Sequence, residues 1–462
     1  MRKKIIAAAV AVVMFLGALP LAITAPNRSV DEIFAHFLAG PVERVFRPNV
    51  PVYAVEPVLA YPHVAGRLTD EFLQQGLHEA NFVRYLAGLP ADLVMDHAMN
   101  NRAQHGAALL AYSVQLTHSP RRPEQMEDEF FEMARQGTSA SNLAWGAHSL
   151  WEAVLAYTHN SERNSISHLG HRRWILNPQL QRVGFGFVDR YSAMQVLDTS
   201  RRGRLDFDKI LWPAMGNFPV EYMAGDQAWS VSLNPIIYDN TRTSNITVSL
   251  IRRIDGRVWR FTNENDDPNG NFFNVSTQAF GVPFCIIFRP YGIESYNSGD
   301  EFLVEISGVY LRTGIRTTIT YEVSFFQLFE KIVLTIGEEQ ATATRSGRTE
   351  MFALDPNNGT TPILYQEITL VPLRSIVERM GGTMEFNDSN QNITIRYRDR
   401  VIRMGIGRHR VEVNGTFSNL DAVPQLINGT TMVPVRFISE QLGAAVRWNG
   451  DVQSVTIVYL PS

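Results

Sequence analysis

Two segments near the C-terminal end of the chain repeat each other without a gap, and no other feature constrains the fold as strongly. The first reads ITLVPLRSIVERMGGTMEFNDSNQNITI and the second reads TTMVPVRFISEQLGAAVRWNGDVQSVTI. The matched positions hold residues of several kinds: Pro372 with Pro434, Arg374 with Arg436, Glu378 with Glu440, Gly381 with Gly443 and Phe386 with Trp448. Such a repeat indicates one supersecondary unit used twice. Each copy predicts a strand, a proline-led entry into a short helix that ends at glycine, and a β-hairpin.

The composition predicts several domains with real hydrophobic cores. Apolar residues make up 45% of the chain and charged residues 19%. At about 100 to 200 residues per domain, 462 residues predict about two to four domains. The formal net charge is -4 without a basic block, so we expect no nucleic-acid partner. The single cysteine, Cys285, excludes an internal disulfide, and its apolar neighbours favour a buried hydrophobe over a nucleophile.

Residues 1–25 have the pattern of a targeting segment. Basic residues at positions 2 to 4 precede an almost wholly apolar run that ends at Leu19, and small residues follow up to Ala25. This order is typical of a secretory signal peptide. The run is also long enough to stay uncleaved as a membrane anchor, so both alternatives stay open. Either one predicts a secreted, extracellular or envelope-associated protein that touches a membrane only through this segment.

The middle of the chain changes from helical to strand-like patterns. Thr69 caps the first predicted helix, TDEFLQQGLHEANFVRYL, where apolar residues recur every three or four positions. Further helical patterns and a short sheet follow up to about residue 200. Residues 229–330 instead hold short β-type runs between turn signals such as Asp-Gly and Asn-Gly. This second region predicts a β-rich domain with an immunoglobulin-like sandwich.

Most of the histidines lie in the helical region, at positions His97, His105, His118, His148, His159, His168 and His171. A zinc site needs three or four converging ligands. No pair has the HExxH spacing, and the chain has no Gly-x-Ser-x-Gly elbow or phosphate loop. On spacing alone, these side chains either cap helices or line a cleft.

Four segments of the helical region together carry a family resemblance. NFVRYLAGLP, AQHGAALLAYSVQLTHSP, SNLAWG and LGHRRWILNPQLQRVGFGFV occur in this order within about residues 72–200. They resemble the CAP superfamily of cysteine-rich secretory proteins, antigen 5 and pathogenesis-related 1 proteins, in its disulfide-free bacterial form. The resemblance implies an αβα sandwich with a cleft of two histidines and two glutamates. In some members this cleft binds a divalent metal such as zinc.

The resemblance also implies specific cleft residues in this chain. His118 and His171 match the two histidines, and Asn142 matches an asparagine of the family. Ser141 stands where the family has its first glutamate. Its lack of a carboxylate removes a metal ligand and a general base, which favours ligand binding over metal-dependent catalysis.

The second acid of the implied cleft has two candidates, Glu152 and Glu162. With Glu152, a metal ion would be held by His118, His171 and Glu152. Arg172 follows His171 directly. Its guanidinium holds an anionic ligand, pairs with helix carbonyls or pairs with the acids of residues 124–132, and these alternatives stay open.

The C-terminal repeat is similar to the copper amine oxidase N-terminal-like domain, also called a stalk domain. LVPLRSIVERMGG and MVPVRFISEQLGAAVRWN carry the similarity, over residues 362–460. It implies a module for surface or wall attachment. A copper site is not expected, because this segment has one histidine, His409, and no cysteine.

The predicted fold class is α+β multidomain, with an αβα-sandwich CAP domain, a β-sandwich-like middle domain and a C-terminal α+β tandem-repeat stalk domain. The predicted order is a signal peptide or anchor (1–25), a lead-in segment (26–68), the CAP domain (69–200), a connecting arm (201–228), the β-rich domain (229–330), a linker (331–361) and the stalk domain (362–460).

These features support three functional hypotheses. The first is a secreted bacterial protein without enzymatic activity, whose cleft binds a cell-wall polymer or a small ligand and whose stalk domain positions it at the envelope. The second is a metal-dependent hydrolase or peptidase, in which a metal-bound water attacks the substrate. The third is a structural envelope protein with a degenerate cleft. The missing carboxylate at Ser141 favours the first.

Overall fold

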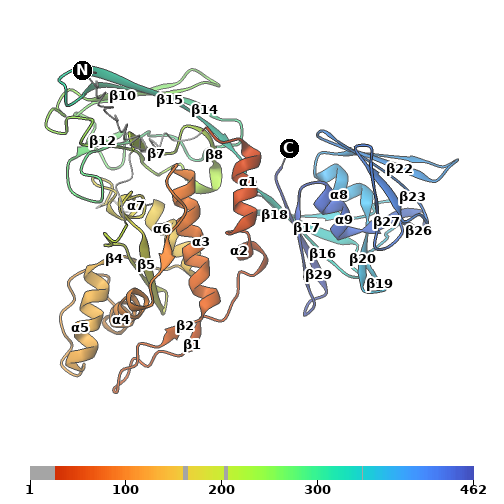
Figure 1. Ribbon diagram of the computed structural model, residues 1–462, viewed down its shortest axis with the longest axis horizontal. Helices are drawn as coiled ribbons and strands as arrows, with labels where there is room; N and C mark the ends of the chain where they lie inside the picture. The colour runs from red at the N-terminus through yellow and green to blue at the C-terminus, as the bar shows by residue number, and fades with distance from the viewer. Residues whose placement is uncertain (1–26, 160–164, 202–206, 346, 462) are drawn as a thin grey trace, which may run out of the picture.

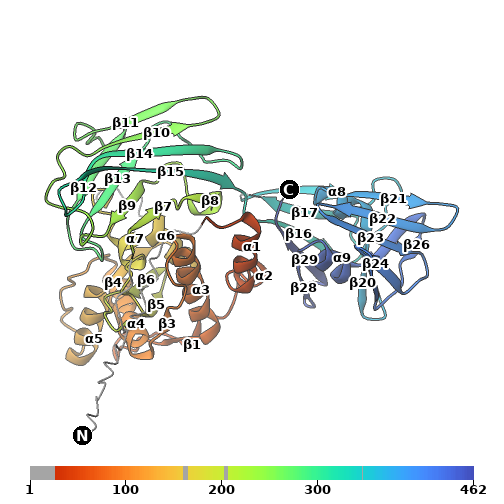
Figure 2. The ribbon, with the colours of Figure 1, turned by 45° about the horizontal axis from the view of Figure 1, so that its top comes forward.

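The computed structural model describes residues 27–159, 165–201, 207–345 and 347–461. The N-terminal helices lie beneath a β-rich middle part, and the C-terminal part lies to one side (Figures 1 and 2). The predicted targeting segment, residues 1–25, and the candidate acid Glu162 lie outside the described residues. Within the described ranges, no helix has the length and apolarity needed to cross a membrane.

The predicted lead-in segment spans residues 26–68, and its described part, residues 27–68, is packed rather than loose. It holds α1 (Val30–Ala39), α2 (Glu43–Phe46) and the strand pair β1 (Tyr53–Val55) and β2 (Arg67–Leu68). Helix α1 begins with a capping box between Ser29 and Glu32. Its buried face carries Ile33, Phe34 and Phe37, so this segment contributes to the core. The spacing of these three side chains is the helical signal that a reading based on proline and valine content overlooked.

The helical part encloses a small sheet. Its elements in chain order are α3 (Asp70–Leu86), β3 (Val94–Met95), α4 (His97–Ser113), α5 (Asp128–Ser139), β4 (Ser141–Trp145), α6 (Leu150–His159), α7 (Gly170–Ile175), β5 (Arg182–Val188) and β6 (Tyr191–Gln195). The sheet order is β3-β5-β6-β4. The cap at Thr69 is confirmed, because its hydroxyl accepts a hydrogen bond from the Phe72 amide at 3.2 Å. Gly184 and Gly186 leave room for the backbone of α4, because a Cβ at either position would overlap it.

The β-rich part consists of two sheets that share one aromatic interior. The strands are β7 (Lys209–Trp212), β8 (Gly216–Pro219), β9 (Trp229–Leu233), β10 (Thr247–Arg252), β11 (Val258–Phe261), β12 (Phe272–Ser276), β13 (Cys285–Arg289), β14 (Glu301–Tyr310) and β15 (Arg316–Phe326), with the 3-10 turn η1 at Val220–Tyr222. The sheet orders are β11-β10-β14-β15-β8 and β12-β13-β9-β7. The ring of Trp229 in the second sheet lies 5.7 Å from that of Phe302 and 6.1 Å from that of Phe325 in the first. Residues 201–228 were predicted to be a connecting arm. That prediction was wrong, because β7 and β8 are strands of these two sheets.

The C-terminal part begins earlier than predicted. Its first strands are β16 (Glu330–Thr335), β17 (Gln340–Arg345) and β18 (Arg348–Ala353), where polar composition predicted a linker at residues 331–361. Strand β16 pairs with the last strand, β29 (Ser454–Tyr459), through Ile332 opposite Ile457. The linker prediction was wrong because these residues form paired strands, and β16 buries Ile332 and Leu334 on one face.

The two copies of the repeat adopt the same local structure. The first copy is β20 (Ile368–Pro372), α8 (Leu373–Arg379), β21 (Thr383–Asn387) and β22 (Asn392–Tyr397), and the second is β27 (Thr430–Pro434), α9 (Val435–Gln441), β28 (Ala445–Asn449) and β29. The remaining strands are β19 (Ile363–Tyr365), β23 (Arg400–Gly405), β24 (Arg410–Val413), β25 (Thr416–Asn419) and β26 (Gln425–Ile427). Strands β20 and β27 pair antiparallel with Val371 opposite Val433. Both helices stop before a glycine with positive φ, Gly381 and Gly443, as the repeat predicted.

The predicted fold class was wrong. Strands account for 37% of the residues and helices for 22%, so the α+β description led by an αβα-sandwich CAP domain gave helices too large a part. One hydrophobic core runs without a break from Phe37 of α1 through Phe185 of β5 to Trp229 of β9. The helical part therefore does not close as a sandwich of its own. Helical periodicity in the sequence reports local structure and does not reveal that two parts share one core.

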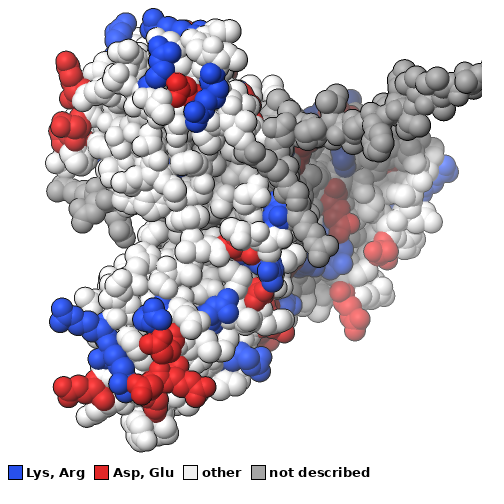
Figure 3. Space-filling model, turned by 60° about the vertical axis from the view of Figure 1, so that its left-hand side comes forward, with Lys and Arg blue, Asp and Glu red and all other residues white. Residues whose placement is uncertain are grey.

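Charged side chains of both signs are intermixed on the surface. On the face shown in Figure 3, basic and acidic groups lie side by side toward the two ends, and a broad uncharged area separates them. The formal net charge of -4 is therefore spread over a mixed surface.

Candidate functional site

The structure brings two of the predicted site residues together, His118 and His171. Helix α7 carries His171, and His118 lies in the loop that follows α4. Helix α4 ends at Ser113, and the next residue, Val114, takes a left-handed conformation with φ of 49°. The two imidazole centroids are 6.3 Å apart, and the ring of Tyr157 from α6 lies 5.8 Å from that of His171. The pair therefore joins three elements that are distant in the sequence.

Hydrogen bonding and burial set the chemical state of the pair. Nδ1 of His118 lies 3.1 Å from the carbonyl oxygen of Thr138. A carbonyl can only accept, so Nδ1 carries the proton and a neutral His118 has its lone pair on Nε2. Burial, helped by the nearby His118 and His168, lowers the pKa of His171 to about 4. His171 is therefore neutral near neutral pH.

Ser141 and Asn142 hold the surrounding backbone. The Ser141 hydroxyl donates a hydrogen bond to the Gly137 carbonyl at 2.6 Å. The Asn142 amide donates to the carbonyl of His171 at 3.0 Å. Asn142 therefore joins β4 to α7 and positions His171, whereas the hydroxyl of Ser141 joins β4 to the end of α5.

Arg172 lies in the interior, and its contacts are those of a structural residue. It is 0% exposed. Its guanidinium donates to the carbonyls of Thr158 and Ala228, both at 2.6 Å. Arg173 makes similar bonds to the carbonyls of Gln278 at 2.7 Å and Val282 at 2.6 Å. Of the alternatives left open by the sequence, the structure shows pairing with backbone carbonyls.

Glu152 caps a helix. Its carboxylate accepts a hydrogen bond from the His148 amide at 2.7 Å, at the start of α6. Across the described residues, no three or more His, Cys, Asp or Glu side chains are grouped so that they could hold a metal ion. His118, His171 and Glu152 therefore do not form the three-ligand group that a zinc site needs.

A buried ionic cluster lies in the helical part, and the sequence reading missed it. Arg44 of α2 pairs with Glu79 of α3, and the hydroxyl of Tyr222 from η1 donates to the same carboxylate at 2.8 Å. Glu79 is 0% exposed and Arg44 is 8% exposed. The available signal was a glutamate on the apolar face of the α3 pattern, beside Ala80 and Val83.

An apolar cavity of about 590 Å³ lies next to this cluster, between the helical, β-rich and C-terminal parts. Trp151, Leu155, Met223 and Phe329 contribute to its lining. Glu221 lines it as well and accepts hydrogen bonds from the Leu328 amide at 3.0 and 3.1 Å. Burial raises the pKa of Glu221 to about 7.

Acid is expected to destabilise the protein through its buried histidines. Burial and the nearby Arg172 lower the pKa of His159 to about 4 from its ordinary value of 6.5. The unfolded chain therefore takes up a proton before the folded chain does, and stability falls as the pH drops from about 6.5 toward about 4. Replacing His159 with leucine should remove about 2 kcal/mol of the stability lost between about pH 7.5 and pH 4.5.

Urea unfolding at both pH values measures this effect. The replacement His97→Leu, at an exposed ring on α4, serves as the control and should leave the pH profile unchanged. An unchanged profile in His159→Leu would show that another group carries the acid sensitivity.

Comparison with known proteins bears on the C-terminal part. Residues 356–457 match the family model described as copper amine oxidase N-terminal domain. Residues 356–457 form a copper amine oxidase N-terminal-like domain. A curated relative from Brevibacillus choshinensis, named "Protease inhibitor", is 32% identical over 93 residues. That match covers 20% of this chain and 28% of the relative's length. No solved structure matches the chain.

The residues of this C-terminal domain do not fit a copper site, in spite of the family's name. Copper favours histidine, cysteine and methionine ligands. The domain has one histidine, His409, and no cysteine, and its four methionines are buried in the hydrophobic core: Met380, Met384, Met404 and Met432. Nδ1 of His409 donates to the Leu420 carbonyl at 3.0 Å, so this side chain could offer a metal only its Nε2, and one histidine ligand falls short of a copper site.

Proposed function

We propose that this is a secreted, non-enzymatic ligand-binding protein of bacteria that its C-terminal domain holds at the cell envelope. The observation that carries the proposal is the pair His118 and His171, whose ring centroids are 6.3 Å apart. The ring of Tyr157 lies 5.8 Å from that of His171, so the pair presents imidazole groups beside an aromatic surface. Such a site suits a polar small molecule or a segment of wall polymer.

The resemblance to the CAP superfamily supports this proposal at the level of motifs. It drew attention to the Gly-His-Arg-Arg segment and to His118. The family's first glutamate is replaced by Ser141, whose hydroxyl is bonded to the Gly137 carbonyl. A serine held in this way is a poor general base, which favours binding over hydrolysis.

Binding at the histidine pair is tested with soluble fragments of cell wall as the probe. We expect them to shift the imidazole NMR signals of His118 and His171. The double variant His118→Ala, His171→Ala should weaken binding by at least about tenfold. The control carries His97→Ala and His148→Ala, two exposed rings, and should bind as the parent does.

Other outcomes would favour the rival hypotheses. Stoichiometric zinc in the purified protein, with peptide hydrolysis that stops on chelation, would establish a metal-dependent hydrolase. Equal behaviour of both double variants would contradict ligand binding at the pair and favour a structural envelope protein.

The role in attachment needs a second measurement. A chain that ends at Leu328 removes β16 and everything after it, and its folding is checked by circular dichroism. We expect this chain to move from the envelope fraction into the medium, whereas the His118→Ala, His171→Ala variant stays with the envelope. The same distribution for the truncated and full chains would contradict attachment through the C-terminal domain.

A further inference from the structure

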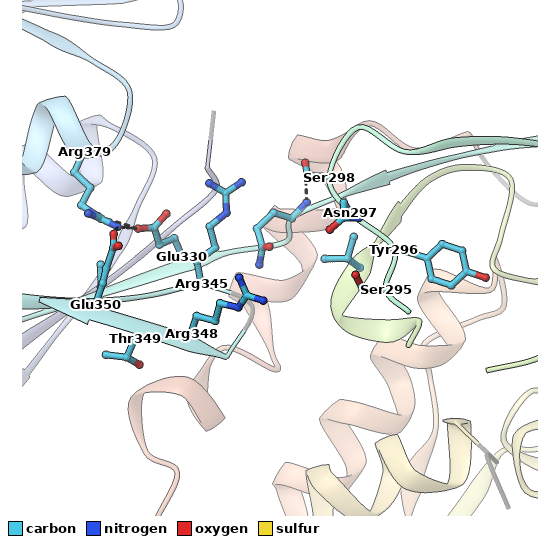
Figure 4. Close-up of a pocket in the computed structure, with 13 residues that line it drawn as sticks. Ser295, Tyr296, Asn297, Ser298, Glu330, Arg345, Arg348, Thr349, Glu350 and Arg379 are labelled. Atoms are coloured by element: carbon cyan, nitrogen blue, oxygen red, sulfur yellow. Dashed lines mark hydrogen bonds and ion pairs between the residues drawn. The ribbon is translucent and has the colours of Figure 1, made fainter. Parts of the chain in front are cut away.

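A second cavity, of about 790 Å³, lies where the β-rich part meets the C-terminal part (Figure 4). One wall is the end of the β17–β18 hairpin, with Arg345 and Arg348, and the opposite wall is the loop Ser295–Ser298. In Figure 4 the Arg348 side chain extends from the hairpin toward this loop, and the Arg345 side chain stands beside it. A cavity of this volume is within the range of small-molecule sites.

The register of the strands places the two arginines directly beside each other. Arg345 is opposite Glu330 on one side and opposite Arg348 on the other, so the three side chains form one row on one face of the sheet. Residues opposite each other in an antiparallel pair have Cβ atoms about 5 Å apart, and like charges there are destabilising. The sheet thus holds two cations at neighbouring positions.

The acids of the cavity do not neutralise this pair. Glu330 is 4% exposed and accepts a hydrogen bond from Nε of Arg379 at 2.9 Å. Glu350 pairs with the same guanidinium. Among the described residues, Arg345 and Arg348 have no carboxylate or other hydrogen-bond partner, and both are exposed. Two cations therefore face the cavity without a counter-ion from the described protein.

The opposite wall supplies neutral hydrogen-bonding groups on a fixed loop. The Ser298 hydroxyl accepts from the Gln327 amide at 3.3 Å, which leaves its proton free to donate. Asn297 is fixed through its amide, which donates to the carboxylate of Asp300 at 2.8 Å. Tyr296 turns away into the core, where its hydroxyl accepts from Nε1 of Trp229 at 2.7 Å.

We propose that this cavity binds a phosphate ester with a hydroxyl-rich body, such as a polyol phosphate. The phosphate lies between the guanidinium groups of Arg345 and Arg348, whose planar N–H donors match the spacing of its oxygens. Its negative charge also offsets the repulsion between the two cations. The hydroxyl groups contact Ser295, Asn297 and Ser298. This site is separate from the histidine pair and does not depend on the function proposed above.

Calorimetry on the full chain tests the site, with glycerol 3-phosphate and oligo(glycerol phosphate) as probes and glycerol as the neutral comparison. We expect both phosphates to bind, more weakly as the salt concentration rises, and glycerol not to bind. If oligo(glycerol phosphate) binds more tightly per phosphate group than glycerol 3-phosphate, the ligand is a surface polymer. If the two probes bind equally per phosphate group, the ligand is a free phosphate ester. Equal binding of glycerol, or of glucuronate as a carboxylate, would overturn the assignment to phosphate.

Variants make the test specific. The double variant Arg345→Gln, Arg348→Gln should lose at least about tenfold in affinity. Its control, Arg260→Gln with Arg316→Gln, removes the same charge from exposed positions on β11 and β15 and should bind as the parent does. Arg348→Glu should abolish binding while keeping or raising the melting temperature, because it turns a like-charge pair into an opposite one. Undiminished binding in Arg348→Glu would overturn the proposal.

Discussion

Replacing Arg44 with methionine is expected to lower the free energy of unfolding by about 3 to 5 kcal/mol, because Glu79 would keep a buried carboxylate without its cation. Glu79 is 0% exposed, so water cannot take over the role of the guanidinium. The hydroxyl of Tyr222 would remain as a donor at 2.8 Å, but a neutral donor offsets only part of the loss.

Urea unfolding followed by circular dichroism measures this effect, and the chain offers a matched control. Arg47, directly after α2, pairs with Glu71 of α3 at 3.2 Å, with side chains 71% and 48% exposed. Arg47→Met should cost less than about 1 kcal/mol, as for other exposed pairs. A loss of similar size in both variants would show that Glu79 is not held as a charged group.

A double replacement separates the buried charge from the lost packing. Arg44→Met together with Glu79→Leu removes both charges and leaves an apolar pair, so it should recover most of the stability lost in Arg44→Met. If the double variant is as unstable as the sum of the single variants, packing by the arginine stem explains the effect instead.

The repeat shows what a sequence can predict well. The strand, the short helix and the glycine stop were all predicted from Pro372, Gly381 and their matches, and each has the expected structure. These features are local, since a proline fixes the helix entry and a glycine takes the positive φ that ends it. The family match to residues 356–457 supports the same region independently.

The extent of the C-terminal part could not be predicted in this way. Strand β16 pairs with β29, and Ile332 lies opposite Ile457 across a long stretch of chain. Sequence pattern reports the neighbours of a residue along the chain and says nothing of a partner so far away. The same limit applies to α1. Its buried face packs against a distant segment of the chain, where the ring centroids of Phe37 and Phe329 are 5.1 Å apart.

The candidate site was likewise predicted only in part from the sequence. The motifs located His118 and His171, which lie together, but did not decide whether Arg172 binds an anionic ligand, helix carbonyls or nearby acids. The deciding contact is with Ala228, just before β9, in a part of the chain that the motif does not include. Arg345 and Arg348 were not singled out at all, because their significance comes from strand register and not from spacing.

Replacing Arg172 with methionine is expected to cost about 3 to 5 kcal/mol and to loosen the helical part from the β-rich part. The guanidinium bonds the Thr158 carbonyl at the end of α6 and the Ala228 carbonyl before β9, both at 2.6 Å. A buried carbonyl left without a donor costs about 1 to 3 kcal/mol, and methionine fills the space but donates nothing. Arg172→Lys keeps the charge and should still lose most of this stability, because an ammonium cannot reproduce the planar fork.

Urea unfolding measures the loss in these Arg172 variants, and hydrogen exchange at the amide of Trp229 reports whether β9 loosens first. The control is Arg190→Met, since Arg190 also donates to a backbone carbonyl, that of Gly146 at 3.0 Å, but from an exposed position. Water can replace that bond, so the control should lose less than about 1 kcal/mol. If Arg172→Met resembles the control, the second arginine of the segment, Arg173, must join the two parts. Its bonds to the Gln278 and Val282 carbonyls, at 2.7 and 2.6 Å, would then be the connection that keeps the core continuous.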